Sequence, residues 1–183
     1  MLANTITLGR VFFTFGVIAL FRVPSVLNRG IPAAIVLIFT LDAVDGLVAR
    51  KYNQTTKLGA ILDPIADRII ENTFWIYFTV TGLTPLWMPV TILTSGFLID
   101  NLQPYINPSK NGWTHLLIRS YTSQALCGIA KMSTFLFLAS ISIFKPENTA
   151  IESAGTILVN ATIAFCLIRG TPSLVIVWKN FRR

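Results

Sequence analysis

The stretch DAVDGLVARKYNQTTKLGAILDPIAD, residues 42–67, is the part of this chain that says most about it. It holds half of the eight acidic residues in the protein: Asp42, Asp45, Asp63 and Asp67. Residues three or four apart share a helix face, so each pair of acids forms one stripe. Strongly apolar segments flank the stretch, and carboxylates in such surroundings are costly and usually functional. The pattern predicts a functional site.

The composition is typical of an integral membrane protein, because 53% of the 183 residues are hydrophobic and only 13% are charged. A membrane-crossing helix needs about 17–25 residues. Six stretches meet that need if the acids are counted inside them: 5–21, 31–50, 59–81, 85–102, 120–144 and 151–178. We therefore expect an all-α bundle of six transmembrane helices, forming one domain over residues 1–183, with the first helix retained as a span.

The net charge of +7 favours one orientation in the membrane. Short cytoplasmic loops tend to carry Lys and Arg, and three such residues lie at 50–57 and three more at 179–183. Both termini and the acidic site are expected on the cytoplasmic side of a prokaryotic inner (plasma) membrane. The basic residues form no stripe of the kind that binds nucleic acid, so membrane lipids are the expected partners of this charge.

The spacing of the four acids predicts a metal site. Counted from Gln54, Asp45 and Asp63 are each nine residues away, and Asp42 and Asp67 are twelve and thirteen. At about 1.5 Å per residue, the two helices bring the acids to matching depths in one cavity. Four like charges in such a cavity cannot all stay ionised unless cations are present, and carboxylate oxygens favour Mg²⁺, Mn²⁺ or Ca²⁺. Two such ions favour transfer at a phosphorus atom.

Small and basic residues beside the acids support a phosphate ligand. Gly46, Ala49 and Gly59 leave room for a base or a diphosphate to approach the backbone. Arg50 can bind phosphate through two parallel hydrogen bonds. The alternative is that the small residues serve close helix packing.

The pattern Asp-x2-Asp-Gly-x2-Ala-Arg-x8-Gly-x3-Asp-x3-Asp resembles the signature of the CDP-alcohol phosphatidyltransferase family at all eight specified positions. The resemblance implies an enzyme that transfers a phosphatidyl-type group from a CDP-linked lipid to an alcohol, releases CMP, uses two Mg²⁺ or Mn²⁺ ions and forms a homodimer. By the same resemblance Asp67 is the catalytic base. The implied metal ligands are Asp42, Asp45, Asp63 and Asp67, and the implied CDP-binding residues are Asn4, Thr7, Asp42, Gly46, Ala49, Arg50 and Gly59.

Asn4-x2-Thr7-x2-Arg10 is similar to a segment that opens the first helix in glycerophosphate-using members of that family. There it supplies donors near the nucleotide. For Arg10 the alternative is a guanidinium that extends from the helix end to the membrane surface.

Residues 53–57 and 62–67 resemble the phosphatidylglycerophosphate synthase branch, which makes glycerol 3-phosphate the leading acceptor. A phosphate-bearing acceptor needs cations from later helices, and Arg119, Lys131 and Arg169 are the candidates; the alternative is anchoring at the membrane interface. Other acceptors, such as inositol phosphate or serine, stay open.

Two further interpretations concern the remaining polar groups. Buried acids also mark ion pathways, so an ion- or proton-coupled transporter is the rival function, although transporters more often show internal repeats. Glu71 is expected to pair with Arg68. Cys127 and Cys166 are expected to behave as small hydrophobes.

Overall fold

The computed structural model describes residues 2–21, 26–51, 59–102, 121–144 and 149–181. The described side chains leave out those of residues 2–4, 26–27, 43–51, 60, 102, 121, 173–174 and 176–181. Residues 52–58 and 103–120, and with them Arg119, therefore lie outside the described residues.

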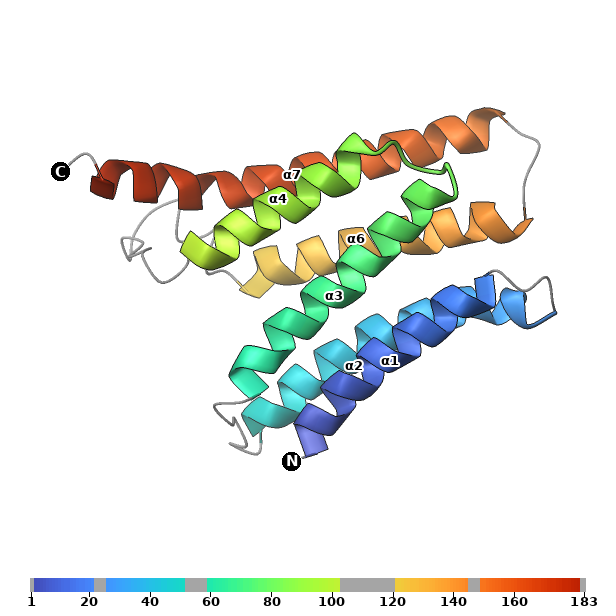
Figure 1. Cartoon of the computed structure of the whole chain (residues 1–183), viewed down its shortest axis with the longest axis horizontal. Helices are drawn as coiled ribbons and strands as arrows, with labels where there is room; N and C mark the ends of the chain where they lie inside the picture. The colour runs from blue at the N-terminus through green and yellow to red at the C-terminus, as the bar shows by residue number, and fades with distance from the viewer. Residues whose placement is uncertain (1, 22–25, 52–58, 103–120, 145–148, 182–183) are drawn as a thin grey trace. The chain divides into compact units, whose positions relative to one another are not determined.

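Helices make up almost all of the described chain (Figure 1). They are α1 (Leu2–Phe21), the 3-10 helix η1 (Val26–Gly30), α2 (Ile31–Lys51), α3 (Gly59–Val80), α4 (Trp87–Leu102), α6 (Tyr121–Phe144) and α7 (Thr149–Phe181). The all-α prediction is confirmed for these residues, and each of the six predicted helices begins and ends within three residues of an observed α-helix.

The end of α3 is set by Gly82, whose φ of 79° lies in the left-handed region that glycine adopts without strain. The amide of Leu83 donates to the carbonyl of Phe78 at 2.9 Å, and that of Gly82 donates to Thr79 at 3.0 Å. These two bonds form a Schellman cap, which satisfies carbonyls that the helix end would otherwise leave open. The cap turns the chain from α3 toward α4.

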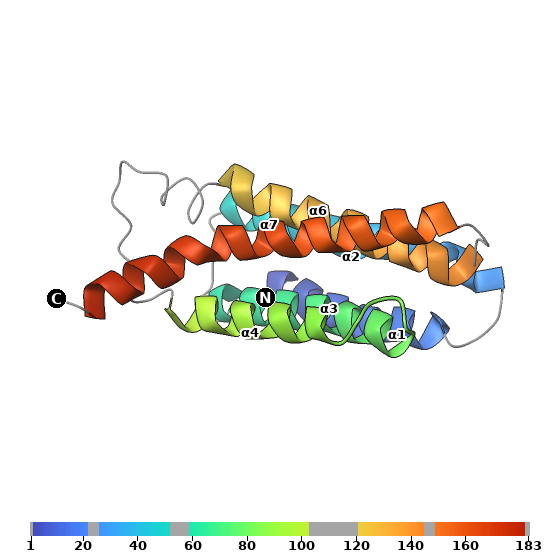
Figure 2. The ribbon, with the colours of Figure 1, turned by 90° about the horizontal axis from the view of Figure 1, so that it is seen from above.

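The chain divides into two compact units, of which the first comprises Met1–Thr84 and Phe135–Glu147. In this unit α1 packs along both α2 and α3, and Figure 2 shows α1 next to α3. Its core is aromatic: Phe135 lies 5.2 Å from Phe74 and 4.9 Å from Trp75, measured between ring centroids. Aromatic rings in such offset and edge contacts bury much apolar surface and stabilise a core beyond their area alone.

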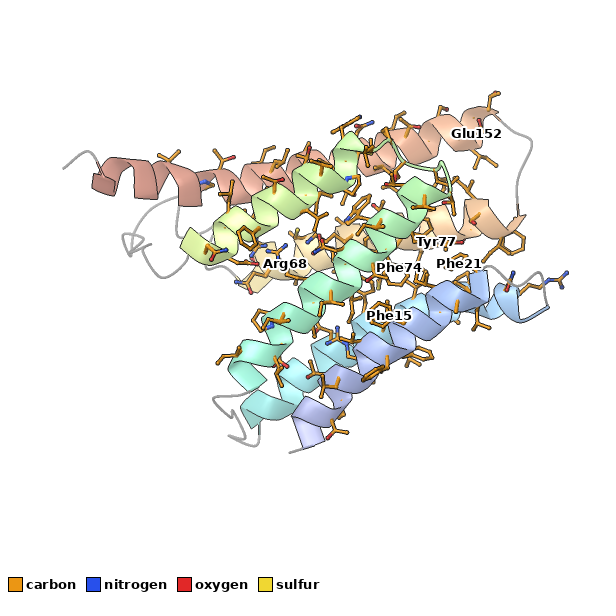
Figure 3. The ribbon with its side chains drawn as sticks, in the orientation of Figure 1. Phe15, Phe21, Arg68, Phe74, Tyr77 and Glu152 are labelled. Carbon is orange, nitrogen blue, oxygen red and sulfur yellow. The ribbon has the colours of Figure 1, made fainter. Side chains whose placement is uncertain are left out.

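Phe21, the last residue of α1, extends this core toward α3. Its ring centroid lies 4.6 Å from that of Tyr77 (Figure 3) and 6.1 Å from that of Phe78. The contact joins the ends of two helices that are far apart in sequence. It therefore fixes how α1 and α3 lie along each other.

The second unit comprises Pro85–Thr134 and Asn148–Arg183, so α6 contributes to this unit as far as Thr134. Here α4 packs along α7. Gly170 of α7 is buried, and a Cβ atom at that position would collide with the Ile99 side chain of α4. The absence of a side chain at Gly170 thus lets the two helices approach closely.

Two helical segments, Thr122–Phe144 and Thr149–Pro172, are long and apolar enough to cross a membrane. The apolar part of α1, Thr5–Phe21, is shorter. The acidic residues of the predicted site lower the mean hydropathy of α2 and α3. The six crossings and the single domain over residues 1–183 stay predictions.

Candidate functional site

Two of the four predicted acids meet at one side chain of α1. The guanidinium of Arg10 donates from Nη1 to Oδ1 of Asp42 at 2.6 Å and from Nη2 to Oδ1 of Asp67 at 3.3 Å. Asp42 lies on α2 and Asp67 on α3, so a single planar group contacts carboxylates from two helices. The predicted neighbourhood of Asp42 and Asp67 is confirmed, with a partner from a third helix.

Arg10 itself is buried, with 4% of its side chain exposed. Its Nε donates to the backbone carbonyl of Ile38 on α2 at 3.1 Å. The alternative in which Arg10 extends away from the helices to the membrane surface is therefore wrong. An arginine carries its charge at every relevant pH, so a permanent cation lies inside the first unit.

The carboxylates beside Arg10 are accessible from outside the protein. The side chains of Asp42 and Asp67 are 41% and 47% exposed. A ligand can therefore reach Asp42 and Asp67 while both acids contact the buried guanidinium of Arg10. This combination of a fixed cation and open carboxylates distinguishes the site from a closed structural ion pair.

Asp63, the third described acid, is held by a second group of α1. The hydroxyl of Thr7 donates to Oδ1 of Asp63 at 2.8 Å. Thr7 is 1% exposed, and Asp63 is exposed. A buried hydroxyl that donates to an exposed carboxylate helps to orient that carboxylate.

Thr7, Arg10 and Thr14 form one buried face of α1, with 1%, 4% and 1% exposed. Their spacing of three and four residues places them on one side of a helix. The hydroxyl of Thr14 bonds the backbone carbonyl of Arg10 at 2.8 Å, so it stays within α1. Sequence reasoning missed Arg10 as the partner of the acids, although this polar spacing within an apolar helix was the available signal.

One turn beyond Asp67, Glu71 is buried at 7% exposed and lies 3.7 Å from Arg68, measured between Oε2 and Nη1. The predicted pairing of Glu71 with Arg68 is confirmed. Figure 3 labels Arg68 on α3. A pair between neighbours on one helix supports that helix modestly.

Several predicted site residues lie on described helices while their side chains lie outside the described part. The backbone of α2 includes four of them, and α1 includes the fifth: Asp45, Gly46, Ala49, Arg50 and Asn4. Gly59 is described, is buried and begins α3. The roles assigned to these positions stay predictions.

The two described candidates for acceptor binding, Lys131 on α6 and Arg169 on α7, belong to the second unit. Both are half-buried. The Nε atom of Arg169 is buried without a hydrogen-bond partner among the described residues. Burial of part of a guanidinium is costly, so this position is unusual for a simple membrane anchor.

The donor set suits a hard divalent cation in its chemistry. Asp42 and Asp67 present carboxylate oxygens, which Mg²⁺ and Mn²⁺ prefer. Among the described side chains, which do not include Asp45, no group of three His, Cys, Asp or Glu is arranged to hold a metal ion. Arg10 contacts Asp42 and Asp67, two of the residues predicted as metal ligands.

Comparison with known proteins adds a family to this geometry. The family model described as CDP-alcohol phosphatidyltransferase matches residues 1–168. A Rickettsia typhi protein named CDP-diacylglycerol–glycerol-3-phosphate 3-phosphatidyltransferase is 28% identical over 143 residues, which are 78% of this chain and 74% of that protein.

A second relative carries a different name. A Mycobacterium bovis protein named "Putative cardiolipin synthase" is 33% identical over 97 residues, which are 53% of this chain and 42% of that protein. The chain thus matches less than half of the length of this relative. The two relatives thus carry different enzyme names.

Proposed function

The chain belongs to the CDP-alcohol phosphatidyltransferase family, and on this premise we propose that it transfers a phosphatidyl-type group from a CDP-linked lipid to an alcohol, with glycerol 3-phosphate as the leading acceptor. The observation that supports this most is the meeting of Asp42 and Asp67, from two helices, at Arg10. Their spacing in sequence and their contact in space agree with a single site that handles charged phosphates.

The reaction exchanges one phosphorus–oxygen bond for another. The hydroxyl oxygen of the acceptor forms a bond to the lipid-bearing phosphorus of the donor, and the bond from that phosphorus to the CMP oxygen breaks. CMP leaves with the electron pair, and the acceptor hydroxyl loses its proton. We assign the acceptance of this proton to Asp67, because a base must lie within hydrogen-bond reach of the hydroxyl and Asp67 is open to ligands.

The remaining acids bind and orient. Asp42, Asp45 and Asp63, together with Asp67, are the proposed metal ligands, and Thr7 orients Asp63 through its 2.8 Å bond. Proteins of this family depend on a divalent metal, and Mg²⁺ or Mn²⁺ held by these residues would supply charge stabilisation for the phosphate oxygens.

The nucleotide is assigned to the residues next to these acids. Gly46, Ala49 and Gly59 allow its close approach, as small residues do. Arg50 and Asn4 donate to its polar groups in this proposal. A CDP-lipid and an alcohol are the substrates that the family implies.

The acceptor phosphate is assigned to Lys131 of α6 and Arg169 of α7, and to Arg119, which lies outside the described residues. We expect Lys131→Ala to raise the KM for glycerol 3-phosphate by about tenfold or more, because a charge-assisted hydrogen bond is lost, while the KM for the CDP-lipid changes little. Initial rates of CMP release at varied acceptor concentration measure this. An unchanged acceptor KM would remove Lys131 from the assignment.

Two helices long and apolar enough to cross a membrane, together with the family, indicate a membrane protein. The finer proposal is a six-span protein of a prokaryotic inner membrane, with both termini and the site on the cytoplasmic side, acting as a homodimer. The distribution of Lys and Arg supports this orientation.

Release of CMP from CDP-diacylglycerol tests the function directly. Purified protein with Mn²⁺ is given glycerol 3-phosphate, inositol phosphate, serine or phosphatidylglycerol in turn, and the lipid product is identified. Turnover with glycerol 3-phosphate that Asp67→Asn eliminates is the expected result. If the parent protein turns over none of these acceptors, the proposal is wrong, and ion flux into vesicles becomes the next measurement.

A further inference from the structure

Arg10 has no part in the reaction as proposed above, yet its buried guanidinium makes several described hydrogen bonds to other helices. Its three described bonds go to Asp42, Asp67 and the carbonyl of Ile38, at 2.6, 3.3 and 3.1 Å. All three acceptors lie on α2 or α3, and none lies on its own helix. Arg10 thus connects the two acid-bearing helices through α1, which packs along both.

The need for such a connection follows from charge. Two carboxylates that approach each other repel, and the repulsion grows as the surroundings become less polar. A cation that contacts both carboxylates attracts each of them, and these two attractions offset the repulsion. Because the guanidinium is planar with several fixed donors, it can hold two carboxylates at once, which the single ammonium of a lysine does less well.

We propose that Arg10 is a positioning residue: it is the resident counter-cation that holds Asp42 and Asp67 together when no divalent ion is bound, and it shares these carboxylates with the ion when one binds. This inference rests on the proposed use of the two acids as metal ligands. It assigns Arg10 a role toward the metal, and none in contact with the reacting atoms.

The proposal has a consequence that a purely structural arginine lacks. If Arg10 and the ion neutralise the same acids, removal of Arg10 leaves more negative charge for the ion to satisfy. Binding of the ion should then stabilise the variant more than the parent, since a ligand stabilises the folded state according to its affinity. An arginine that only fills space would lower stability equally with and without the ion.

The experiment compares thermal unfolding of the full chain in detergent, in EDTA and in saturating MnCl₂, and Mn²⁺ binding by electron paramagnetic resonance. The variants are Arg10→Gln, which removes the charge, and Arg10→Lys, which keeps it. Thr14→Val is the matched control, because Thr14 is equally buried on the same face of α1 and has no described bond to the acids.

We expect Arg10→Gln to have a lower Tm in EDTA, a larger Mn²⁺-induced rise in Tm than the parent, and a Kd for Mn²⁺ lower by on the order of tenfold. Arg10→Lys should fall between the parent and Arg10→Gln, and Thr14→Val should show the parental rise. If Arg10→Gln does not fold, the Mn²⁺ affinity of Arg10→Lys decides, and a value at or below the parental affinity overturns the proposal.

An equal or smaller Mn²⁺ effect in Arg10→Gln also overturns the role of Arg10, while binding of Mn²⁺ by the parent leaves the proposed function intact. If the parent itself neither binds Mn²⁺ nor gains stability from it, the metal-dependent function fails, and the role of Arg10 fails with it. The two failures are therefore distinguishable in one set of measurements.

Discussion

Each unit contains a described contact between helices, and the two contacts differ in their chemistry. In the first unit α1 reaches α2 and α3 through a charged contact, Arg10 with Asp42 and Asp67. In the second unit α6 and α7 meet through neutral groups, as in the 2.7 Å contact between the hydroxyls of Thr134 and Thr162. Neutral small groups are the ordinary way for apolar helices to associate, whereas buried charge is costly and calls for a function.

The neutral contacts of the second unit continue along the helix pair. The Sγ atoms of Cys127 and Cys166 lie 3.0 Å apart without forming a disulfide. From this contact to the threonine pair the chain moves forward along α6 and backward along α7, so the two helices are antiparallel. Here the expected behaviour of cysteines as small hydrophobes is consistent with their place between packed helices.

The largest expected effect on activity comes from replacing the acids of the first unit. We expect the rate of CMP release to fall by more than about 100-fold in each of Asp42→Ala, Asp63→Ala and Asp67→Asn. Loss of a metal ligand lowers activity more than loss of a residue that only hydrogen-bonds to a ligand. The control is Glu152→Gln, which changes an exposed acid of α7 and should retain parental activity. Equal loss in the control would mean that net charge, and not this site, governs activity.

A smaller effect is expected where a neutral donor supports a charged group. Thr7→Val removes the hydroxyl that bonds Asp63, and activity should fall by about 10–100-fold, the range found for groups that orient metal ligands. Thr7→Ser keeps the hydroxyl and should retain most of the activity. Equal rates for the two variants would show that the bond to Asp63 does not matter.

In the second unit a substitution should change stability rather than chemistry. Gly170→Ala places a Cβ atom against Ile99, and the overpacking should lower the free energy of unfolding by about 1–3 kcal/mol. Ile99→Val shortens the colliding side chain and should restore part of this loss in the double variant. Thermal unfolding in detergent measures both, and an unchanged Tm for Gly170→Ala would show that α4 and α7 adjust without cost.

The smallest effect is expected for the threonine pair. Thr162→Val removes one partner, while the hydroxyl of Thr134 still donates to the carbonyl of Ala130 at 2.9 Å, so the cost should be about 0.6 kcal/mol, as for other hydrogen bonds between membrane helices. A double-mutant cycle with Thr134→Val isolates the coupling energy. A coupling as large as that between Arg10 and Asp42 would remove the distinction between the two units.

The positions of the helices could be predicted from the sequence because helix formation depends on neighbours along the chain. Apolar stretches of helical length, ended by polar or glycine-containing segments, predicted each described α-helix to within three residues, whereas the 3-10 helix η1 was not predicted. The glycine at position 82, in the left-handed region, ends α3 close to its predicted end. The acids at helical spacing were equally visible, since i, i+3 and i+4 neighbours share a face whatever the fold.

The partners of those acids could not be predicted in the same way. The spacing of the acids concerns only the two helices that carry them, and the sequence around Arg10 is compatible with two alternatives for its side chain. Arg10 and Asp67 are separated by 57 positions, and no local rule brings them together. The contact depends on α1 packing along α2 and α3, which is a property of the whole unit.

The sequence by itself determined an all-α chain, the limits of its helices, and four acids in two stripes whose spacing points to one phosphate-handling family. Hydrogen bonds between residues four apart, and the helical period that follows from them, are local and can be counted along the chain. Only the tertiary structure decided that α1 supplies the cation for Asp42 and Asp67 and the hydroxyl for Asp63. Such contacts arise from packing between distant segments, where shape and charge select one arrangement among many that the local pattern allows.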